Sequence, residues 1–258
     1  MLLALDIGNT NTVLGLFDDG ALVHDWRIRT EVNMTIDEYA ITLRSLFAVH
    51  GIPLDSVSDV IISCVVPPVL NSAERFCQSY FRTTALVVGP GIRTGMPILY
   101  DNPKEVGADR IVNAVAAYEQ RKDAVIVVDF GTATTFDYIS ERGEYIGGVI
   151  SPGIMISCEA LFQKASKLPR VEIFARPPSI LAKNTISSMN AGIVYGYAGL
   201  VEGIITRIKK EVNRDIYVIA TGGLAPLIAS ECPMINAVDD YLTLNGLRII
   251  FDRNKKPA

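Results

Sequence analysis

One phrase occurs twice in this sequence, nearly half the chain length apart. An apolar run ends in Asp6 and continues as Ile7-Gly8-Asn9-Thr10-Asn11-Thr12-Val13, and a second apolar run ends in Asp129 and continues as FGTATT. Glycine lets the backbone approach a ligand, and Thr and Asn side chains and turn amides can donate hydrogen bonds to phosphate oxygens. An aspartate at each strand end could hold a cation that offsets the phosphate charge. One copy alone would fit an ordinary hairpin turn, but two copies predict two related halves that clamp one polyphosphate across a shared cleft.

The first half of the chain predicts the element order βββαβαβ. Three short strands separated by turn residues form an expected antiparallel meander, and the capping box Thr35-Ile36-Asp37-Glu38 predicts the start of a helix. The expected strands cover residues 2–5, 12–17, 21–28, 60–66 and 85–88, with helices following Thr35 and over 69–81.

The second half repeats this beginning. Strands are expected at 124–128, 134–139, 145–150 and 216–220, and helices at 154–165, at 186–212, from 224 and at 242–251. Three prolines in the segment 168–183 indicate a loop. The pattern predicts an α/β protein with two tandem domains, residues 1–118 and 119–258.

The composition excludes several classes of function. The net charge of −4 comes without any long run of Lys or Arg, so we expect no nucleic-acid partner. The four cysteines form no C-x-x-C pair and the chain has two histidines, which argues against zinc and for free thiols in a reducing cytosol. The N-terminal apolar run stops at Asp6, and the longest nearly apolar stretch, 60–70, is too short for a membrane span. We therefore expect a cytoplasmic protein without a membrane partner.

The usual nucleotide-binding signatures are missing. No Gly-Lys pair exists, so the chain has no Walker A loop. The glycines at 89, 91 and 95 follow a predicted strand and imitate a dinucleotide fingerprint, but the last glycine is one position too late and no helix is predicted after it.

Asp109 and Arg110 precede the helical run that begins at Ile111. The dipole of a helix N-terminus favours an ionised aspartate, which suits either a helix cap or an acceptor for the proton of a substrate hydroxyl. An arginine beside it could pair with a substrate carboxylate. A capping aspartate with a surface arginine explains the pair equally well.

Two glycine patterns are weaker indicators. Thr221-Gly222-Gly223 follows a predicted strand and fits a turn on which a nucleotide base or sugar could lie. Glycines at 192, 196, 199 and 203 share one face of a predicted helix, and this spacing favours close packing of another helix or domain over ligand contact.

These motifs together resemble the type III pantothenate kinase family, within the actin, sugar-kinase and acetate-kinase superfamily. The stretches that carry the resemblance span nearly the whole chain: DIGNTNT at 6–12, DNPKEVGADR at 101–110, DFGTATTFD at 129–137, KLPRV at 167–171, KNT at 183–185 and the TGG turn. The resemblance implies two ribonuclease H-like βββαβαβ domains around a nucleotide cleft. It also implies ATP-dependent phosphorylation of the 4′-hydroxyl of pantothenate, the first step of coenzyme A biosynthesis.

The resemblance assigns roles by position. Asp6 to Val13 would form the first phosphate-binding turn, Thr132 would contact ATP from the second, and Asp109 would accept the proton. Asp129 would bind the monovalent cation, potassium or ammonium, that the family uses beside Mg²⁺. The residues expected around pantothenate are Tyr100, Gly107, Ala108, Asp109, Arg110 and Thr185. The family also implies a homodimer with its site near the interface.

Two small departures and two alternatives remain. Ser151 and Ala182 stand where the family has alanine and glycine, which affects only the expected shape of the loop before Thr185.

A nucleotide-binding regulator or scaffold of the same superfamily would share the phosphate turns, and so would a kinase for a sugar or another small hydroxy acid. Pantothenate-dependent release of ADP distinguishes both alternatives from a pantothenate kinase.

Overall fold

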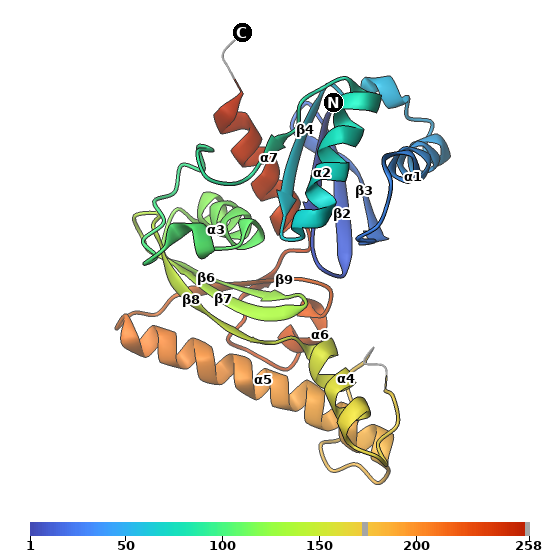
Figure 1. The fold of residues 1–258 in the computed structure, drawn as a ribbon. Coiled ribbons are helices and arrows are strands. Elements are labelled where there is room, and N and C mark those ends of the chain that lie inside the picture. Colours follow the sequence, from blue (N-terminus) through green and yellow to red (C-terminus); the bar gives the residue numbers. More distant parts are fainter. Residues whose placement is uncertain (172–174, 256–258) are drawn as a thin grey trace. The chain divides into compact units, whose positions relative to one another are not determined.

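The computed structural model describes residues 1–171 and 175–255, and within these the chain forms two compact units. The first unit comprises residues 1–116 together with the C-terminal segment from Leu242, and the second comprises residues 117–241. Figure 1 shows each unit as a sheet with helices packed on it.

The first unit is built on a five-stranded sheet in the order β3-β2-β1-β4-β5. The strand β1 pairs antiparallel with β2 and parallel with β4, and β2 pairs antiparallel with β3, so the predicted meander is confirmed. The strands are β1 (Leu2–Ile7), β2 (Asn11–Asp18), β3 (Ala21–Arg29), β4 (Asp59–Cys64) and β5 (Leu86–Val87).

Helices pack on both faces of this sheet. The helix α1 (Ile36–Val49) begins at the predicted capping box, and with α2 (Pro67–Phe76) it packs on the face that carries Leu3 and Leu5. The helix α7 (Leu242–Asn254) contacts β1, β2 and β4 and approaches Gly15 so closely that a Cβ there would lie 2.8 Å from Leu244. Short helical turns complete the unit: η1 (Leu54–Ser56), η2 (Cys77–Phe81) and η3 (Pro103–Glu105).

The second unit repeats the topology of the first. Its sheet has the order β10-β9-β6-β7-β8, in which β6 pairs antiparallel with β7 and parallel with β9, as β1 does with β2 and β4. The strands are β6 (Val125–Phe130), β7 (Ala133–Ile139), β8 (Tyr145–Pro152), β9 (Tyr217–Thr221) and β10 (Ala237–Val238). The expected order of strands and helices is therefore present in both halves.

Three helices, α4 (Ile154–Lys164), α5 (Thr185–Glu211) and α6 (Ala225–Ala229), enclose the core of the second unit. Their apolar side chains pack on the face of the sheet that carries Ile126 and Val128. The helix α3 (Ala108–Arg121) contains the boundary between the two units.

The compact units divide the chain after residue 116, and the domain bounds 1–118 and 119–258 stay a prediction. The predicted second domain runs to residue 258, whereas α7 packs on the first sheet and belongs to the first unit. The predicted loop at 168–183 forms neither helix nor strand where the structure describes it, and residues 172–174 of that prediction lie outside the described residues. Among the helices of the described ranges, none has the length and apolar character needed to cross a membrane.

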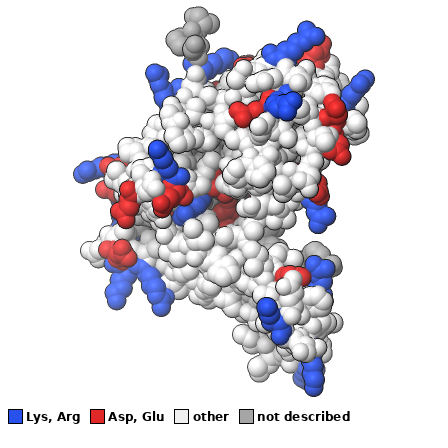
Figure 2. All heavy atoms as spheres, viewed as in Figure 1, with Lys and Arg blue, Asp and Glu red and all other residues white. Residues whose placement is uncertain are grey.

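The surface in Figure 2 carries Lys and Arg side chains scattered among Asp and Glu, without a continuous basic area on this face.

Candidate active site

The first turn lies at the carboxyl end of β1. Asp6 and Ile7 end the strand, the backbone N–H of Gly8 donates to the carbonyl of Asn11 at 3.0 Å, and the chain returns along β2. Asn9 and Thr10 are exposed, so their side chains and amides can reach a ligand. Ile7 is fully buried and can contribute only through its backbone.

A residue that the sequence did not single out anchors this turn. The hydroxyl of Thr30 donates to the carbonyl of Gly8 at 2.7 Å, and the Thr30 N–H donates to the carbonyl of Thr10 at 3.0 Å. The Thr12 hydroxyl lies 2.9 Å from the Thr30 hydroxyl and must donate to it, because the one hydroxyl proton of Thr30 is already used. Thr12 is therefore a buried support of the turn.

The second turn lies at the equivalent end of β6. Asp129 is the penultimate residue of the strand, the N–H of Gly131 donates to the carbonyl of Ala133 at 3.1 Å, and Thr132 is exposed at the tip. Gly153 supports the turn from below, because any side chain there would collide with the carbonyl of Thr132. Sequence reasoning missed Gly153, since its contact partner lies on another element.

Gly222 leaves room for the carboxylate of Asp129. It follows β9 with φ of +95°, and a Cβ at this position would lie 2.8 Å from Oδ1 of Asp129 and 2.7 Å from the carbonyl oxygen of Phe130. Only glycine adopts this backbone conformation without strain while leaving room for the carboxylate. The TGG turn thus has a local function in placing Asp129.

Asp109 lies in the first turn of α3, which begins at Ala108. Its Oδ1 accepts a hydrogen bond from the N–H of Arg110 at 2.8 Å. The same oxygen lies so close to Gly107 that a Cβ there would be 2.5 Å away. Burial raises the pKa of the Asp109 carboxyl above its ordinary value, while the Arg110 N–H and guanidinium act in the opposite direction. A raised pKa makes the ionised carboxylate a stronger proton acceptor near neutral pH.

Asp109 and Asp6 lie at the same edge of the first sheet. The N–H of Val65, just after β4, donates to the carbonyl of Ile7 at 3.1 Å, and a Cβ on Gly107 would lie 3.8 Å from Val65. The start of α3 therefore packs beside the end of β1. The predicted proton acceptor and the first phosphate turn are both part of the first unit.

The remaining predicted substrate residues are divided between the units. Tyr100 and Ala108, both half-buried, belong to the first unit together with Gly107 and the buried Arg110. Thr185 begins α5 in the second unit, where the Asn184 side chain caps the helix by accepting the N–H of Ser187 at 2.9 Å.

The oxygen donors at both turns suit hard cations. Carboxylate and hydroxyl oxygens are ligands of Mg²⁺ and of alkali cations, and Mg²⁺ is commonly held by one or two carboxylates together with substrate phosphates and water. Within the described residues no three His, Cys, Asp or Glu side chains gather into a metal site. Asp6 and Asp129 therefore fit cations that arrive with a nucleotide, and they do not form a complete protein cage.

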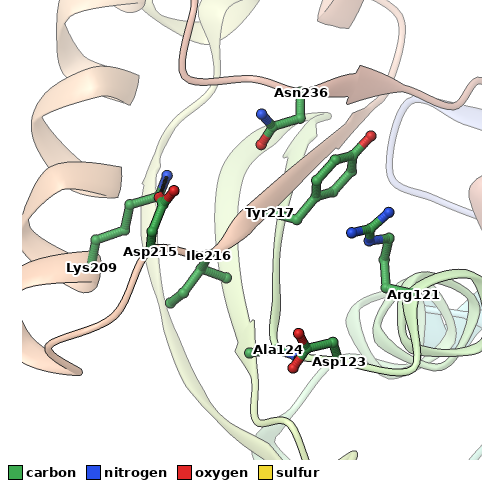
Figure 3. Close-up of a pocket in the computed structure, with 8 residues that line it drawn as sticks. All are labelled: Arg121, Asp123, Ala124, Lys209, Asp215, Ile216, Tyr217 and Asn236. Atoms are coloured by element: carbon green, nitrogen blue, oxygen red, sulfur yellow. Dashed lines mark hydrogen bonds and ion pairs between the residues drawn. The ribbon is translucent and has the colours of Figure 1, made fainter.

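Figure 3 shows a different cavity, of about 240 Å³, at the opposite end of the second sheet. Its two cationic side chains are already engaged: Lys209 contacts Asp215 at 2.7 Å, and the guanidinium of Arg121 lies 3.9 Å from the ring centroid of Tyr217. Asp129 lies at the other end of β6 from this cavity. We interpret the cavity as a structural feature and not as the active site.

Comparison with known proteins identifies relatives over the whole chain. The family model for type III pantothenate kinase matches residues 2–207. The type III pantothenate kinase of Syntrophobacter fumaroxidans is 77% identical over 256 residues, which covers 99% of each chain. That of Syntrophus aciditrophicus is 61% identical over 254 residues, covering 98% of this chain and 100% of the relative.

Solved structures share the fold at low sequence identity. A Baf family transcriptional activator, described as putative, from Campylobacter jejuni has a TM-score of 0.60 at 18% identity, covering 98% of each chain. A ROK family glucokinase from Streptomyces griseus, in complex with glucose and AMPPNP, has a TM-score of 0.56 at 13% identity and also covers 98% of each chain. These likenesses establish the fold of two tandem ribonuclease H-like domains.

Proposed function

The chain belongs to the type III pantothenate kinase family, and from this premise we propose that it transfers the γ-phosphoryl group of ATP to the 4′-hydroxyl of pantothenate. The observation that carries the proposal beyond family membership is the position of Asp109. Its carboxylate lies in the first turn of α3, at the sheet edge that carries the Asp6 turn, and burial raises its pKa. A nucleotide-binding scaffold has no need of such a group.

Asp109 would accept the proton of the substrate hydroxyl as its oxygen attacks the γ-phosphorus and the bond to the β–γ bridging oxygen breaks, releasing ADP. Arg110, held buried beside it, would pair with the pantothenate carboxylate, and Tyr100, Gly107, Ala108 and Thr185 would complete the substrate pocket. Phosphoryl transfer has a loose transition state, so positioning and charge stabilisation contribute most of the catalysis.

The two turns would hold the nucleotide. The segment from Asp6 to Val13 supplies turn amides and the exposed Asn9 and Thr10, and Thr132 supplies a donor from the second half. When bound, Mg²⁺ would neutralise charge on the β- and γ-phosphates beside Asp6. Asp129 would hold the monovalent cation, potassium or ammonium.

An acceptor panel tests the activity. Purified protein is supplied with Mg·ATP, potassium and one acceptor at a time: pantothenate, glucose, N-acetylglucosamine or glycerate. ADP release that depends on pantothenate is expected, and the Asp109→Asn variant serves as the matched control. Release with a sugar or with glycerate in preference to pantothenate would favour the alternative kinase, and release with no acceptor in the panel would favour a scaffold.

We also propose that the chain works as a homodimer assembled through α5. Gly192, Gly196 and Gly199 lie on one exposed face of this helix. Apart from their chain neighbours and the helix's own backbone, no atom of the described residues comes within 4 Å of a Cβ built on any of them. The predicted packing partner of this glycine face is therefore not another part of the described chain. Exposed apolar side chains of the same unit, Ile150 on β8 and Ile186 on α5, add surface that a second copy could bury.

Gly196→Leu tests this assembly. Leucine has room in the single chain, so the variant should fold, but its side chain would separate two helices that meet at the glycine face. We expect the wild type to have the mass of a dimer in light scattering and the variant that of a monomer. Ser45→Leu, at an exposed position of α1 in the first unit, is the control that adds a leucine outside α5. A monomeric wild type would contradict the proposal.

A further inference from the structure

Each motif aspartate has a hydroxyl residue as its direct neighbour on the next parallel strand. Asp6 of β1 is paired with Ser63 of β4, and Asp129 of β6 is paired with Thr221 of β9. These are the same strand positions in the two halves, since β4 and β9 both lie parallel to the strand that carries the aspartate. Paired residues on neighbouring strands point to the same face about 4.8 Å apart, so each hydroxyl lies beside a carboxylate.

Ser63 is buried without a hydrogen-bond partner. Its side chain is 0% exposed, and Oγ has no partner among the described residues. A buried hydroxyl without a partner destabilises the folded state, and alanine at the same position would avoid this cost. A buried polar group without a partner requires an explanation, and one known explanation is that the group interacts with an ion or takes part in catalysis.

Thr221 occupies the equivalent position and is 3% exposed. The residue after it, Gly222, brings the backbone to the Asp129 carboxylate, so the carboxylate lies on the β9 side of its own strand. The carboxylate is thereby turned toward the strand that carries Thr221. In the second unit, the backbone at Gly222 therefore already restricts the orientations that the Asp129 carboxylate can take.

We propose that Ser63 and Thr221 are positioning residues: once a cation is bound, their hydroxyls donate to the carboxylates of Asp6 and Asp129 and fix the orientation in which each carboxylate holds the cation. The unpartnered Ser63 hydroxyl is available for this bond in the cation-free structure. The inference rests on the proposed nucleotide-dependent function. A hydroxyl suits this role because it orients a carboxylate without adding a positive charge that would compete with the cation. Hydrogen-bond partners of metal-ligating groups typically change metal affinity by about 10–100-fold when removed.

The Ser63 arm uses Mn²⁺ in place of Mg²⁺, and ADP as the nucleotide. Free Mn²⁺ is measured by electron paramagnetic resonance in the presence of ADP and of wild-type or Ser63→Ala protein. We expect ADP-dependent Mn²⁺ binding to weaken about 10–100-fold in the variant, while ADP affinity in EDTA stays unchanged. Asp6→Asn should remove most of this binding, and adding Ser63→Ala to it should have little further effect.

Ser140→Ala is the matched control for Ser63→Ala. Ser140 is a buried serine that follows the far end of β7 and bonds Glu144 at 2.8 Å, so its loss should lower stability without changing Mn²⁺ affinity. For Thr221, the concentration of K⁺ that gives half of the thermal stabilisation in Mg·ADP should rise in Thr221→Ala. It should stay near wild type in Thr221→Ser, which keeps the hydroxyl.

Three results would overturn the inference: wild-type Mn²⁺ affinity in Ser63→Ala, equal K⁺ responses of Thr221→Ala and Thr221→Ser, or no ADP-dependent Mn²⁺ binding by the wild type. None of these measurements contains pantothenate. Failure of the proposed substrate would therefore leave the test intact, and failure of this test would leave pantothenate phosphorylation unaffected.

Discussion

The two sheets have the same strand order and carry the same aspartate–hydroxyl pair, yet the surroundings of the two pairs differ. In the first unit, Asp6 shares its sheet edge with Asp109, and helices cover both faces of the sheet. In the second unit, Gly131 and Gly222 lie beside the Asp129 carboxylate, and α5 leaves a glycine face exposed. Under the proposed function, a repeated scaffold serves phosphate binding twice, yet the proposed proton acceptor belongs to one copy and the proposed assembly surface to the other.

The two turns are also stabilised by different means. Side-chain hydroxyls tie the first turn to the end of β3 through Thr30 and Thr12. Close backbone packing supports the second turn, through Gly153 and Gly222. Substitutions should therefore affect the first turn through lost hydrogen bonds and the second through steric collision.

The largest effect is expected at Asp109 of the first unit, the proposed proton acceptor. Asp109→Asn keeps the shape of the side chain and removes its basicity. Turnover with pantothenate should fall about 10²–10⁴-fold, the usual contribution of a general base, with the fold intact by circular dichroism. Turnover within about threefold of wild type would remove Asp109 from the mechanism.

The next effect distinguishes the roles of the two aspartates. Asp129→Ala should lower activity by about tenfold or more and abolish most of the stimulation by potassium or ammonium, because a carboxylate ligand is lost. Asp6→Asn should raise the requirement for Mg²⁺ and leave the response to potassium in place. Equal rates of the wild type in sodium and in potassium, with Mg²⁺ present, would contradict the assignment of Asp129.

A smaller effect is expected from the anchor of the first turn. Thr30→Val preserves volume and removes the hydrogen bonds to Gly8 and Thr12. A loss of about 0.5–1.5 kcal/mol per hydrogen bond predicts a KM for ATP raised by several-fold with little change in the KM for pantothenate. An unchanged KM for ATP would show that the turn keeps its shape without Thr30.

The smallest effect concerns stability. Burial raises the pKa of Asp109 in the folded protein, so the folded state binds this proton more tightly than the unfolded state does. Ionised Asp109 therefore lowers the free energy of unfolding above the folded pKa, and this cost disappears as the pH falls toward the unfolded value of about 3.9. Asp109→Asn should raise Tm at about pH 8, and the gain should shrink toward about pH 4. A lower Tm than wild type at the higher pH would contradict the sign.

Local patterns were sufficient to predict most of the architecture. Alternating apolar residues and turn residues predicted the strands of both meanders, and the Thr35 capping box marked the start of α1. The strand β10 was missed because its two residues are followed directly by two aspartates, whereas the equally short β5 lies in the apolar run 85–88. The placement of α7 on the first sheet depends on Gly15, which permits close approach of Leu244, and no helical periodicity reveals that partner.

The candidate site shows the same difference between residues that local sequence patterns reveal and residues that only tertiary contacts reveal. Asp6, Asp109 and Asp129 stand at strand ends or a helix start, where the chemistry of a residue can be interpreted from its neighbours in sequence. Thr30 supports Gly8 from 22 residues away, and Ser63 is notable only because of the strand register that places it beside Asp6. Residues that act through such distant contacts require the tertiary structure.

The glycine face of α5 has a thermodynamic consequence for the single chain. Glycine inside a helix is about 0.8–1.0 kcal/mol less favourable than alanine, because the unfolded chain has more conformational freedom to lose. Alanine would fit at Gly192, Gly196 and Gly199, where a Cβ meets nothing within 4 Å. The isolated subunit thus forgoes about 2–3 kcal/mol of helix stability. Alanine at all three positions should yield a more heat-resistant single subunit, so this sequence favours a smooth helix surface over the intrinsic stability of the helix itself.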